Sequence, residues 1–470
     1  MRKTAWRGPL SQEKRRMPTD GQVRAGIGTG GFPARWNRAC GHKTVGSLYL
    51  VLAVLAGLAG GGLALLLQVG QAGLDGAASA PWHRMTIDHG ALMILFCALP
   101  ALTGGFGSWF VPLLLGAPDM AFRRLNLLCW AGLAVSFALV LSGMATAPGM
   151  LLWCAAMLGL SIDMVATVLN MRRPGMALRD MPLFAWAQAL TGMMMVIVLP
   201  VLAASLTRGL LAGTGGRQAE LALRAFSGPE IGLLLLPAAG IVCQVVETFS
   251  GVALRLRGAA LGAMVVLSVG GATIWVHDLF ADGLAVQSVV RPLIEQATIA
   301  VPMLVLLAAW GATVLGGRAA FRVPMLWACA FAVLLVAGPV LALLGGPAAG
   351  HAVALPAALF ATFAGFYYWI GKMTGRACPE RAGRLHVALA VGGSILLLAP
   401  HQPAFVSTGV VLLGLSMLAF VAAIALTLAG RTRPLAANYW GPGARTLEWT
   451  VPSPAPRDSF AGILAHGARA

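Results

Sequence analysis

Charged side chains are scarce in this sequence of 470 residues. Asp, Glu, Lys and Arg together make up 10% of the chain, against 58% for hydrophobic residues, and the mean hydropathy is +0.81. Soluble globular domains carry about 25% charged residues, so this composition excludes a soluble protein. It indicates a chain that crosses a membrane several times, and we expect an all-α fold embedded in the lipid bilayer.

Paired cysteines are absent as well. The seven cysteines are scattered along the chain, and no two of them stand in a C-x-x-C spacing. This pattern excludes a disulfide framework and gives no sign of a zinc or iron–sulfur site. We expect all of them to be ordinary small apolar residues: Cys40, Cys97, Cys129, Cys154, Cys243, Cys329 and Cys378.

A secretory signal is also lacking. Residues 1–41 form a long Arg-rich stretch with Gly and Pro, without a short apolar core followed by small residues. We therefore expect a largely disordered basic arm rather than a cleaved leader. At the other end of the chain, residues 431–470 are expected to form a cytoplasmic tail.

Apolar runs of about 20 residues, the length that a helix needs to cross about 30 Å of hydrocarbon, dominate the rest of the chain. They predict about twelve transmembrane helices within residues 42–430, the eleventh being the shortest. The expected spans are 46–68, 88–115, 125–146, 150–170, 184–206, 229–251, 259–280, 295–315, 323–344, 348–371, 385–399 and 406–429.

Basic residues alternate from loop to loop along this pattern. Lys and Arg concentrate on the cytoplasmic side of short loops. With the N-terminus inside, the inside loops hold most of them, Lys372 included, whereas the outside loops hold only Arg84, Arg208, Arg217, Arg224 and Arg291. We therefore expect both termini in the cytoplasm, in a cell-membrane protein. The net charge of +17 then belongs to the cytoplasmic face of the membrane and requires no nucleic-acid partner.

Three histidines, His89, His277 and His351, stand inside apolar runs near the predicted outer surface. An imidazole is costly in a membrane unless it is paired, hydrated or bound to a metal, so each one marks a candidate site. His89 and His351 lie near the outer ends of two spans that run in the same direction, at matching depth. Two such imidazoles suit a six-coordinate haem iron that transfers electrons. Spacing alone leaves open that each is simply a hydrogen-bonded core residue.

Several long motifs resemble a known family. Asp88-His-Gly-Ala-Leu-Met-Ile-Leu-Phe and Gly104-Gly-Phe-Gly-Ser-Trp-Phe-Val-Pro-Leu-Leu-Leu-Gly-Ala-Pro-Asp-Met-Ala-Phe122 closely resemble the second helix of subunit I of the haem-copper (cytochrome c) oxidases. Gly365-Phe-Tyr-Tyr-Trp369 resembles its tenth helix, and Thr446-Leu-Glu-Trp-Thr450 its tail. The motifs follow the family's order over residues 41–460, so the resemblance is specific and implies the family's twelve-helix bundle.

The resemblance places the family's low-spin haem ligands on His89 and His351, but its oxygen-reducing site is depleted. The high-spin haem ligand is replaced by Ala349. The sixth-helix motif Gly-His-Pro-Glu-Val-Tyr reads Ser227-Gly-Pro-Glu-Ile-Gly232, without a copper ligand and without the cross-linked tyrosine. His277-Asp278 stands in place of a His-His pair and leaves a single copper imidazole. Copper needs several imidazoles and the neighbouring haem an axial base, so we expect no copper and interpret His277 as a remnant.

The family's proton routes are matched only in part. Asp119 matches the mouth of one route and Glu230 its inner glutamate, but Ser108 occupies an intervening Asn position. In the second route Leu306 replaces the lysine, so that route should not conduct. The structural alternative is that Asp119 is a carboxylate at a helix end and that Glu230 lies in the first helical turn after Pro229, where the helix dipole favours an acid.

The expected function is electron transfer within a respiratory complex. One low-spin haem, of a type that the sequence does not specify, would bind between His89 and His351, with a subunit II-like or cytochrome partner at the outer face. Two alternatives stay open: a divergent terminal oxidase that reduces oxygen with cytochrome c, and a transporter or assembly protein without a cofactor. Haem and copper content would distinguish the three.

Overall fold

The computed structural model describes most of the chain from Cys40 onward, as residues 40–73, 80–143, 145–213, 215–281, 290–345, 353–399, 402–430 and 435–460. Residues 40–470 form one compact unit. The predicted basic arm lies outside the described residues. Within the described residues the regular structure is helical throughout, without strands, which confirms the prediction of an all-α fold.

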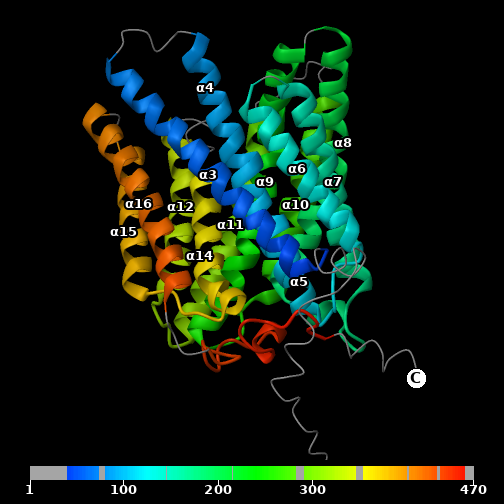
Figure 1. Ribbon diagram of the computed structural model, residues 1–470, viewed down its shortest axis with the longest axis vertical. Helices are drawn as coiled ribbons and strands as arrows, with labels where there is room; N and C mark the ends of the chain where they lie inside the picture. Colours follow the sequence, from blue (N-terminus) through cyan, green and yellow to red (C-terminus); the bar gives the residue numbers. More distant parts are fainter. Residues whose placement is uncertain are drawn as a thin grey trace, which may run out of the picture. The chain divides into compact units, whose positions relative to one another are not determined.

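Helices occupy the predicted spans (Figure 1). The first span is α3 (His42–Gly73), and the second is a succession of α4 (Ala80–Ala91), the π-helices η1 (Leu92–Ala98) and η2 (Pro100–Gly107), and α5 (Ser108–Leu115). The others are α6 (Arg123–Leu141), α7 (Thr146–Asn170), α8 (Leu183–Leu211), α9 (Gly215–Ser250), α10 (Arg257–Ala281), α11 (Val290–Gly316), α12 (Val323–Gly345), α14 (Ala354–Thr374), α15 (Glu380–Leu398) and α16 (Pro403–Ala429).

The number of membrane spans agrees with the prediction. Among the described residues, 11 helical segments are long and apolar enough to cross a membrane, and α12 adds a shorter apolar helix, Val323–Gly338. The apolar side chains that these helices leave exposed, such as Leu128, Val333 and Leu418, face outward from the bundle, as expected of helices in contact with lipid. The chain is therefore a multi-pass membrane protein.

Two helices extend well beyond their predicted ends. α8 continues to Leu211 and α9 begins at Gly215, so most of the predicted outside loop 207–228 is helical. The Ala, Leu, Gln, Glu and Arg residues of this segment are strong helix formers, although its charges interrupt the apolar run. Glu230 therefore lies in the interior of α9, and the prediction that it occupies a first helical turn is wrong.

One end of the bundle collects five connections that contain Arg residues or are directly followed by them, and we call it the basic end. It comprises residues 116–122, 171–182, 251–256, 317–322 and 375–379. Backbone hydrogen bonds join neighbouring loops and helix ends there: Arg173 N–H donates to Leu115 O at 2.9 Å, and Ala320 N–H donates to Phe249 O at 2.9 Å. The predicted alternation of loop charge thus matches the alternation of helix direction.

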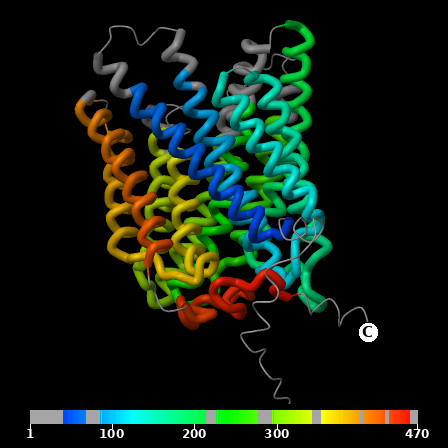
Figure 2. Tube along the Cα trace, in the orientation of Figure 1, coloured from blue at the N-terminus to red at the C-terminus, as the bar shows by residue number. Residues whose placement is uncertain are grey.

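Residues 435–460 lie across the basic end, where Figure 2 shows them in red. They include the short helix η4 (Leu447–Thr450). Lys372, near the end of α14, is fully buried, and its ammonium donates to Ala437 O at 2.6 Å and to Val451 O at 2.8 Å. Lys372 is therefore not the loop charge that the sequence predicted but an anchor for this segment.

α14 lies beside the second span. The ring of Trp369 stacks on that of Phe110, with centroids 4.3 Å apart and planes 15° from parallel, and Phe106 lies 5.6 Å from the same indole. Phe110 stands five residues before the end of α5, and Trp369 five residues before the end of α14. The two helices therefore run in the same direction and reach the basic end at the same depth.

Candidate functional site

His89 lies on α4, near the end of the bundle opposite the basic end. Its Nδ1 is 2.8 Å from the carbonyl oxygen of Gly60 on α3. A carbonyl can only accept, so Nδ1 is the donor, and in the neutral ring Nε2 is then the nitrogen with a free lone pair. Nε2 makes no hydrogen bond with a described residue. This is the arrangement of a metal-ligating imidazole, whose second nitrogen is usually fixed by a carbonyl or carboxylate.

Glycines surround His89 on both helices. A Cβ at Gly60 would lie 2.9 Å from Met93 Sδ, so this glycine permits the close approach of α3 to the second span. By contrast, a Cβ at Gly61, Gly62 or Gly90 would meet nothing within 4 Å. The positions of Gly61, Gly62 and Gly90 are thus open to lipid or to a ligand. His89, with one ring nitrogen held by a carbonyl, has the form of an axial haem ligand.

The helix that carries His89 continues as the π-helices η1 and η2. Pro100 has no N–H, so in an i→i+5 pattern the carbonyl of Leu95 receives no backbone donor. The indole N–H of Trp153 on α7 supplies that donor, at 2.8 Å from Leu95 O. Extended π-helical stretches are rare and are frequent at functional sites. Here the stretch follows directly after the candidate ligand.

The other predicted haem and copper positions fall largely outside the described residues. His351 and Ala349 precede α14 and are among the residues that the structure does not describe. His277 lies in α10, but its side chain is not described, and neither is that of Asp278. The predicted pairing of His89 with His351 and the predicted copper remnant at His277 therefore stay predictions.

The sixth-helix motif is described in part, on α9. A Cβ at Gly232 would lie 3.1 Å from Met194 Cε, and one at Gly228 would lie 3.7 Å from Trp275 Cδ1. A tyrosine at Gly232 would therefore displace the Met194 side chain.

The two residues that the sequence assigned to the proton routes in this region are both at least partly buried. Glu230 is partly buried, and its carboxylate has no hydrogen-bond partner among the described residues. Leu306, at the predicted lysine position of the second route, is fully buried.

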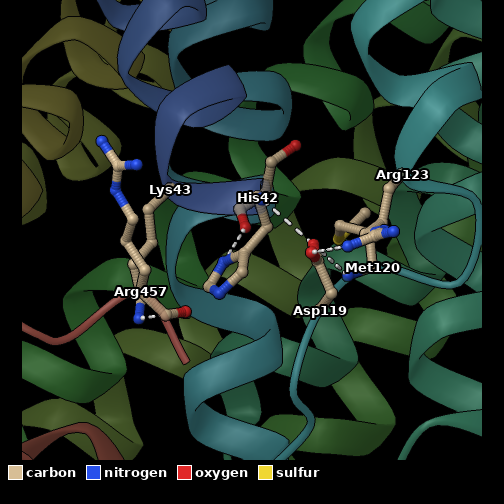
Figure 3. A network of polar contacts seen from close by, with 7 residues as sticks. His42, Lys43, Asp119, Met120, Arg123 and Arg457 are labelled. Atoms are coloured by element: carbon tan, nitrogen blue, oxygen red, sulfur yellow. Dashed lines mark hydrogen bonds and ion pairs between the residues drawn. The ribbon is translucent and has the colours of Figure 1, made fainter. Parts of the chain in front are cut away.

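Asp119 lies at the basic end and caps the first span (Figure 3). Its Oδ1 accepts from the backbone N–H of His42, at 3.0 Å, and of Met120, at 2.9 Å. Its Oδ2 is 3.6 Å from Arg123 Nη1. Burial raises the pKa of Asp119, and the two N–H donors and Arg123 oppose that shift. The carboxylate is thus positioned at the N-terminus of α3, where the helix dipole favours an anion.

A polar cluster extends from Asp119 into the bundle. The Nδ1 of His42 donates to Ser108 O at 3.0 Å, and the hydroxyl of Ser108 accepts from Asn126 Nδ2 at 3.0 Å. The Nε2 of His42 is buried without a partner among the described residues. The sequence pointed to Asp119 and Ser108 but not to Asn126 or His42. The signal for Asn126 was available, since it is an amide in the first turn of α6, within a run that is apolar from Leu125 to Val135 apart from this residue.

Comparisons with known proteins agree with this architecture. The sequence model of the family described as cytochrome c and quinol oxidase polypeptide I matches residues 44–411. The chain belongs to this family. Cytochrome c oxidase subunit 1 of Cereibacter sphaeroides is 31% identical, over 92% of this chain and 95% of its own length. A protein of Streptomyces avermitilis named probable cytochrome c oxidase subunit 1-alpha is 30% identical, over 92% of this chain and 87% of its own length.

This chain of the cytochrome c and quinol oxidase polypeptide I family aligns with a gap-containing match to the Cereibacter protein. Its alignment with the Cereibacter protein runs over 538 positions, more than the 470 residues of this sequence. The alignment therefore contains gaps opposite this chain.

Proposed function

We propose that this subunit I-like membrane protein holds one low-spin haem between His89 and His351 and transfers electrons within a respiratory complex. The observation that carries the proposal is the hydrogen bond from His89 Nδ1 to Gly60 O, at 2.8 Å. It fixes the ring on α3 and leaves Nε2 as the ligating nitrogen. A bound haem would supply an iron that alternates between the ferrous and ferric states; the chain's own residues hold and orient it.

The register of the helices supports the choice of His351 as the second ligand. Phe110 and Trp369 stack at one depth; Phe110 follows His89 by 21 residues, and Trp369 follows His351 by 18. The π-helical segments η1 and η2 lie between His89 and Phe110, and a π-helix rises less per residue than an α-helix because its turn is wider. The π-helical segments can absorb the additional three residues, and the proposal requires His351 to lie at the depth of His89.

We further propose that the oxygen-reducing site is lost and that copper is not bound. Ala349 cannot ligate iron, and Gly228 and Gly232 remove an imidazole and a phenol from the sixth-helix motif. The Met194 side chain occupies the space that a larger side chain at position 232 would enter. His277 and Asp278 alone do not provide the several imidazoles that copper prefers. In this proposal Asp119 acts as the cap of α3, and Glu230 has no proton-consuming site to supply.

The proposed orientation places the basic end in the cytoplasm, because Arg and Lys concentrate on that side. The protein then lies in the cell membrane with both termini inside, and His89 lies near the outer face. A subunit II-like protein or a cytochrome would exchange electrons there. Reporter fusions at the C-terminus and after Gly213 test this orientation, since they should report opposite sides of the membrane.

The deciding experiment is a reduced-minus-oxidised spectrum of the purified protein, with iron and copper counted per chain. We expect one haem iron per chain, no stoichiometric copper, and no spectral response to carbon monoxide. His89→Ala and His351→Ala should each abolish the Soret absorbance, and added imidazole should partly restore it. His466→Ala, in the tail, is the control and should leave the spectrum unchanged.

Other outcomes favour other functions. Two haems with stoichiometric copper and a carbon monoxide-sensitive spectrum would mean that the chain is a divergent terminal oxidase. Purified protein without Soret absorbance, even after expression with added haem precursor, would mean a transporter or assembly protein in the same bundle. Retention of the haem in both single variants would contradict the assignment of the ligands.

A further inference from the structure

A cavity of about 560 Å³ opens at the basic end. It lies where α9 and α14 end and α12 and α15 begin, and residues of the C-terminal segment close one side. Its volume falls within the range of about 300–1,000 Å³ typical of small-molecule sites. It is distant from the proposed haem site, since His89 lies near the opposite end of the bundle. The proposal below is therefore independent of haem binding.

The walls of this cavity are held by contacts within the chain. Arg318 N–H donates to Ser250 O at 3.1 Å, which ties the loop 317–322 to the end of α9. Tyr439 Oη and Trp440 Nε1 both donate to Tyr368 O, at 3.0 Å and 2.9 Å, which ties the C-terminal segment to α14. The cavity is consequently formed without an occupant, as small-molecule sites usually are.

Charge and apolar surface are separated within the cavity. Val323 and Ile370 line it and are buried at 3% and 7% exposure, whereas Arg318 and Arg322 lie at its exposed rim. Neither guanidinium has an ion-pair partner among the described residues. Glu380 is the cavity's one described carboxylate, and it is engaged by the Val323 N–H at 3.2 Å and by Arg384 at 3.3 Å. The free charge at the rim is therefore positive.

We propose that this cavity binds a phosphate ester that carries an apolar or aromatic group. The phosphate would lie between Arg318 and Arg322, because guanidinium groups match phosphate oxygens in geometry and charge. The apolar group would enter between the helix ends, against Val323, Ile370 and Phe249, all of which line the cavity. Either a phospholipid with an anionic headgroup or a free nucleotide offers this chemistry, and the two are separated by experiment.

The test uses the full-length protein in neutral detergent and measures binding by native mass spectrometry. The probes are dihexanoyl phosphatidylglycerol for the lipid source and ATP for the nucleotide source. We expect the wild type to bind one of them and the double variant Arg318→Gln, Arg322→Gln to bind it at least about tenfold more weakly, as loss of two charge-assisted contacts implies. Arg381→Gln, an exposed arginine on α15 outside the cavity, is the control and should bind within about twofold of the wild type.

A second variant keeps the test decisive if the double variant is poorly folded. Ala377 lines the cavity and is exposed, so Ala377→Trp should fill the space and reduce binding while both arginines remain. Preference for phosphatidylglycerol identifies a lipid site, and preference for ATP a nucleotide site. Equal binding of both probes to the wild type and to the variants, or no binding to any of them, overturns the proposal. The haem spectrum decides the proposed function separately.

Discussion

The basic end is held together by many hydrogen bonds within the chain, whereas few such contacts hold the His89 site at the opposite end. Asp119 caps α3, and Lys372 holds the C-terminal segment through two carbonyl oxygens. Around His89, by contrast, the ring is held by a single described hydrogen bond, and three nearby glycines face open space. The haem that we propose at His89 would supply contacts that the chain itself does not make at that end.

This difference would allow the family's bundle to persist after the loss of the oxygen-reducing site that we propose. The interactions that fix helix register, such as the stacking of Trp369 on Phe110 and the buried Lys372, lie at or near the basic end. The described positions among the proposed lost ligands, Gly228 and Gly232, lie in the first half of α9, far from the basic end, where α9 ends at Ser250. Substitution of those ligands therefore costs little folding free energy, and the predictions below separate the two ends on that basis.

Lys372→Met should have the largest effect on stability. The change leaves the carbonyls of Ala437 and Val451 buried without a donor, at a cost of about 3 kcal/mol. We expect a lower melting temperature and faster trypsin cleavage within residues 435–460, with an unchanged haem spectrum. Lys43→Met is the control, because that ammonium contacts the C-terminal segment from a partly exposed position. Loss of haem with the C-terminal segment still protected would contradict the separation of the two ends.

Glu448 should make the basic end sensitive to pH. Burial raises its pKa from 4.5 to about 7, opposed by the hydrogen bond from Thr446 and by the Lys372 ammonium. The folded state therefore favours the protonated acid. This contribution is fully present below the unfolded pKa and is lost as the pH rises through 7. The loss of unfolding free energy should reach at most about 3 kcal/mol.

Melting temperatures measured between pH 5 and pH 8 check this expectation. Glu448→Gln mimics the protonated side chain and should flatten the profile. Thr446→Val removes the hydrogen bond that favours the charged form, so it should steepen the decline. A Gln variant with the same pH profile as the wild type would assign the sensitivity to another group.

The sequence predicted the helices far better than it predicted their contacts. The length of an apolar run is fixed by the thickness of the bilayer, so spans such as 88–115 could be found from local composition. The α8–α9 extension was missed because hydropathy does not report helix propensity outside the membrane. The π-helical stretch depends on a donor from Trp153, 58 residues beyond Leu95, and no local pattern contains that information.

The candidate site shows the same limit. His89 was found because an imidazole in an apolar run is conspicuous. The hydrogen bond between its ring and Gly60 O could not be predicted, because it depends on the packing of α3 on α4. Lys372 was taken for a loop charge because it stands where an apolar run ends. Asn126 and His42 were missed because their role arises from the fold of residues 116–122 around Asp119.

Gly60→Ala should affect the opposite end selectively. The new Cβ would lie 2.9 Å from Met93 Sδ, so either the Met93 side chain must shift or α3 and the second span must move apart. Overpacking typically costs about 1–3 kcal/mol, reduced here by the roughly 1 kcal/mol better helix propensity of alanine. We expect weaker haem retention, measured as Soret absorbance per chain, and an unchanged trypsin pattern at residues 435–460. Leu58→Ala, at an exposed position on α3, is the control and should keep the haem.

Asp119→Asn should have the smallest effect if the carboxylate is only a cap. The amide oxygen of Asn can still accept from His42 N–H, so the loss is the charge interaction with the helix dipole and the half-exposed Arg123, together about 0.5–1 kcal/mol. Asp119→Ala removes the acceptor as well and should cost more, about 1–2 kcal/mol. A proton-route role makes a different prediction, because Asn would then abolish proton uptake while leaving stability nearly intact. Proton uptake on reduction of the protein in liposomes, measured for the wild type and for the Asn and Ala variants, distinguishes the two roles. Uptake that is present in the wild type and lost in the Asn variant would contradict capping as the sole function of Asp119.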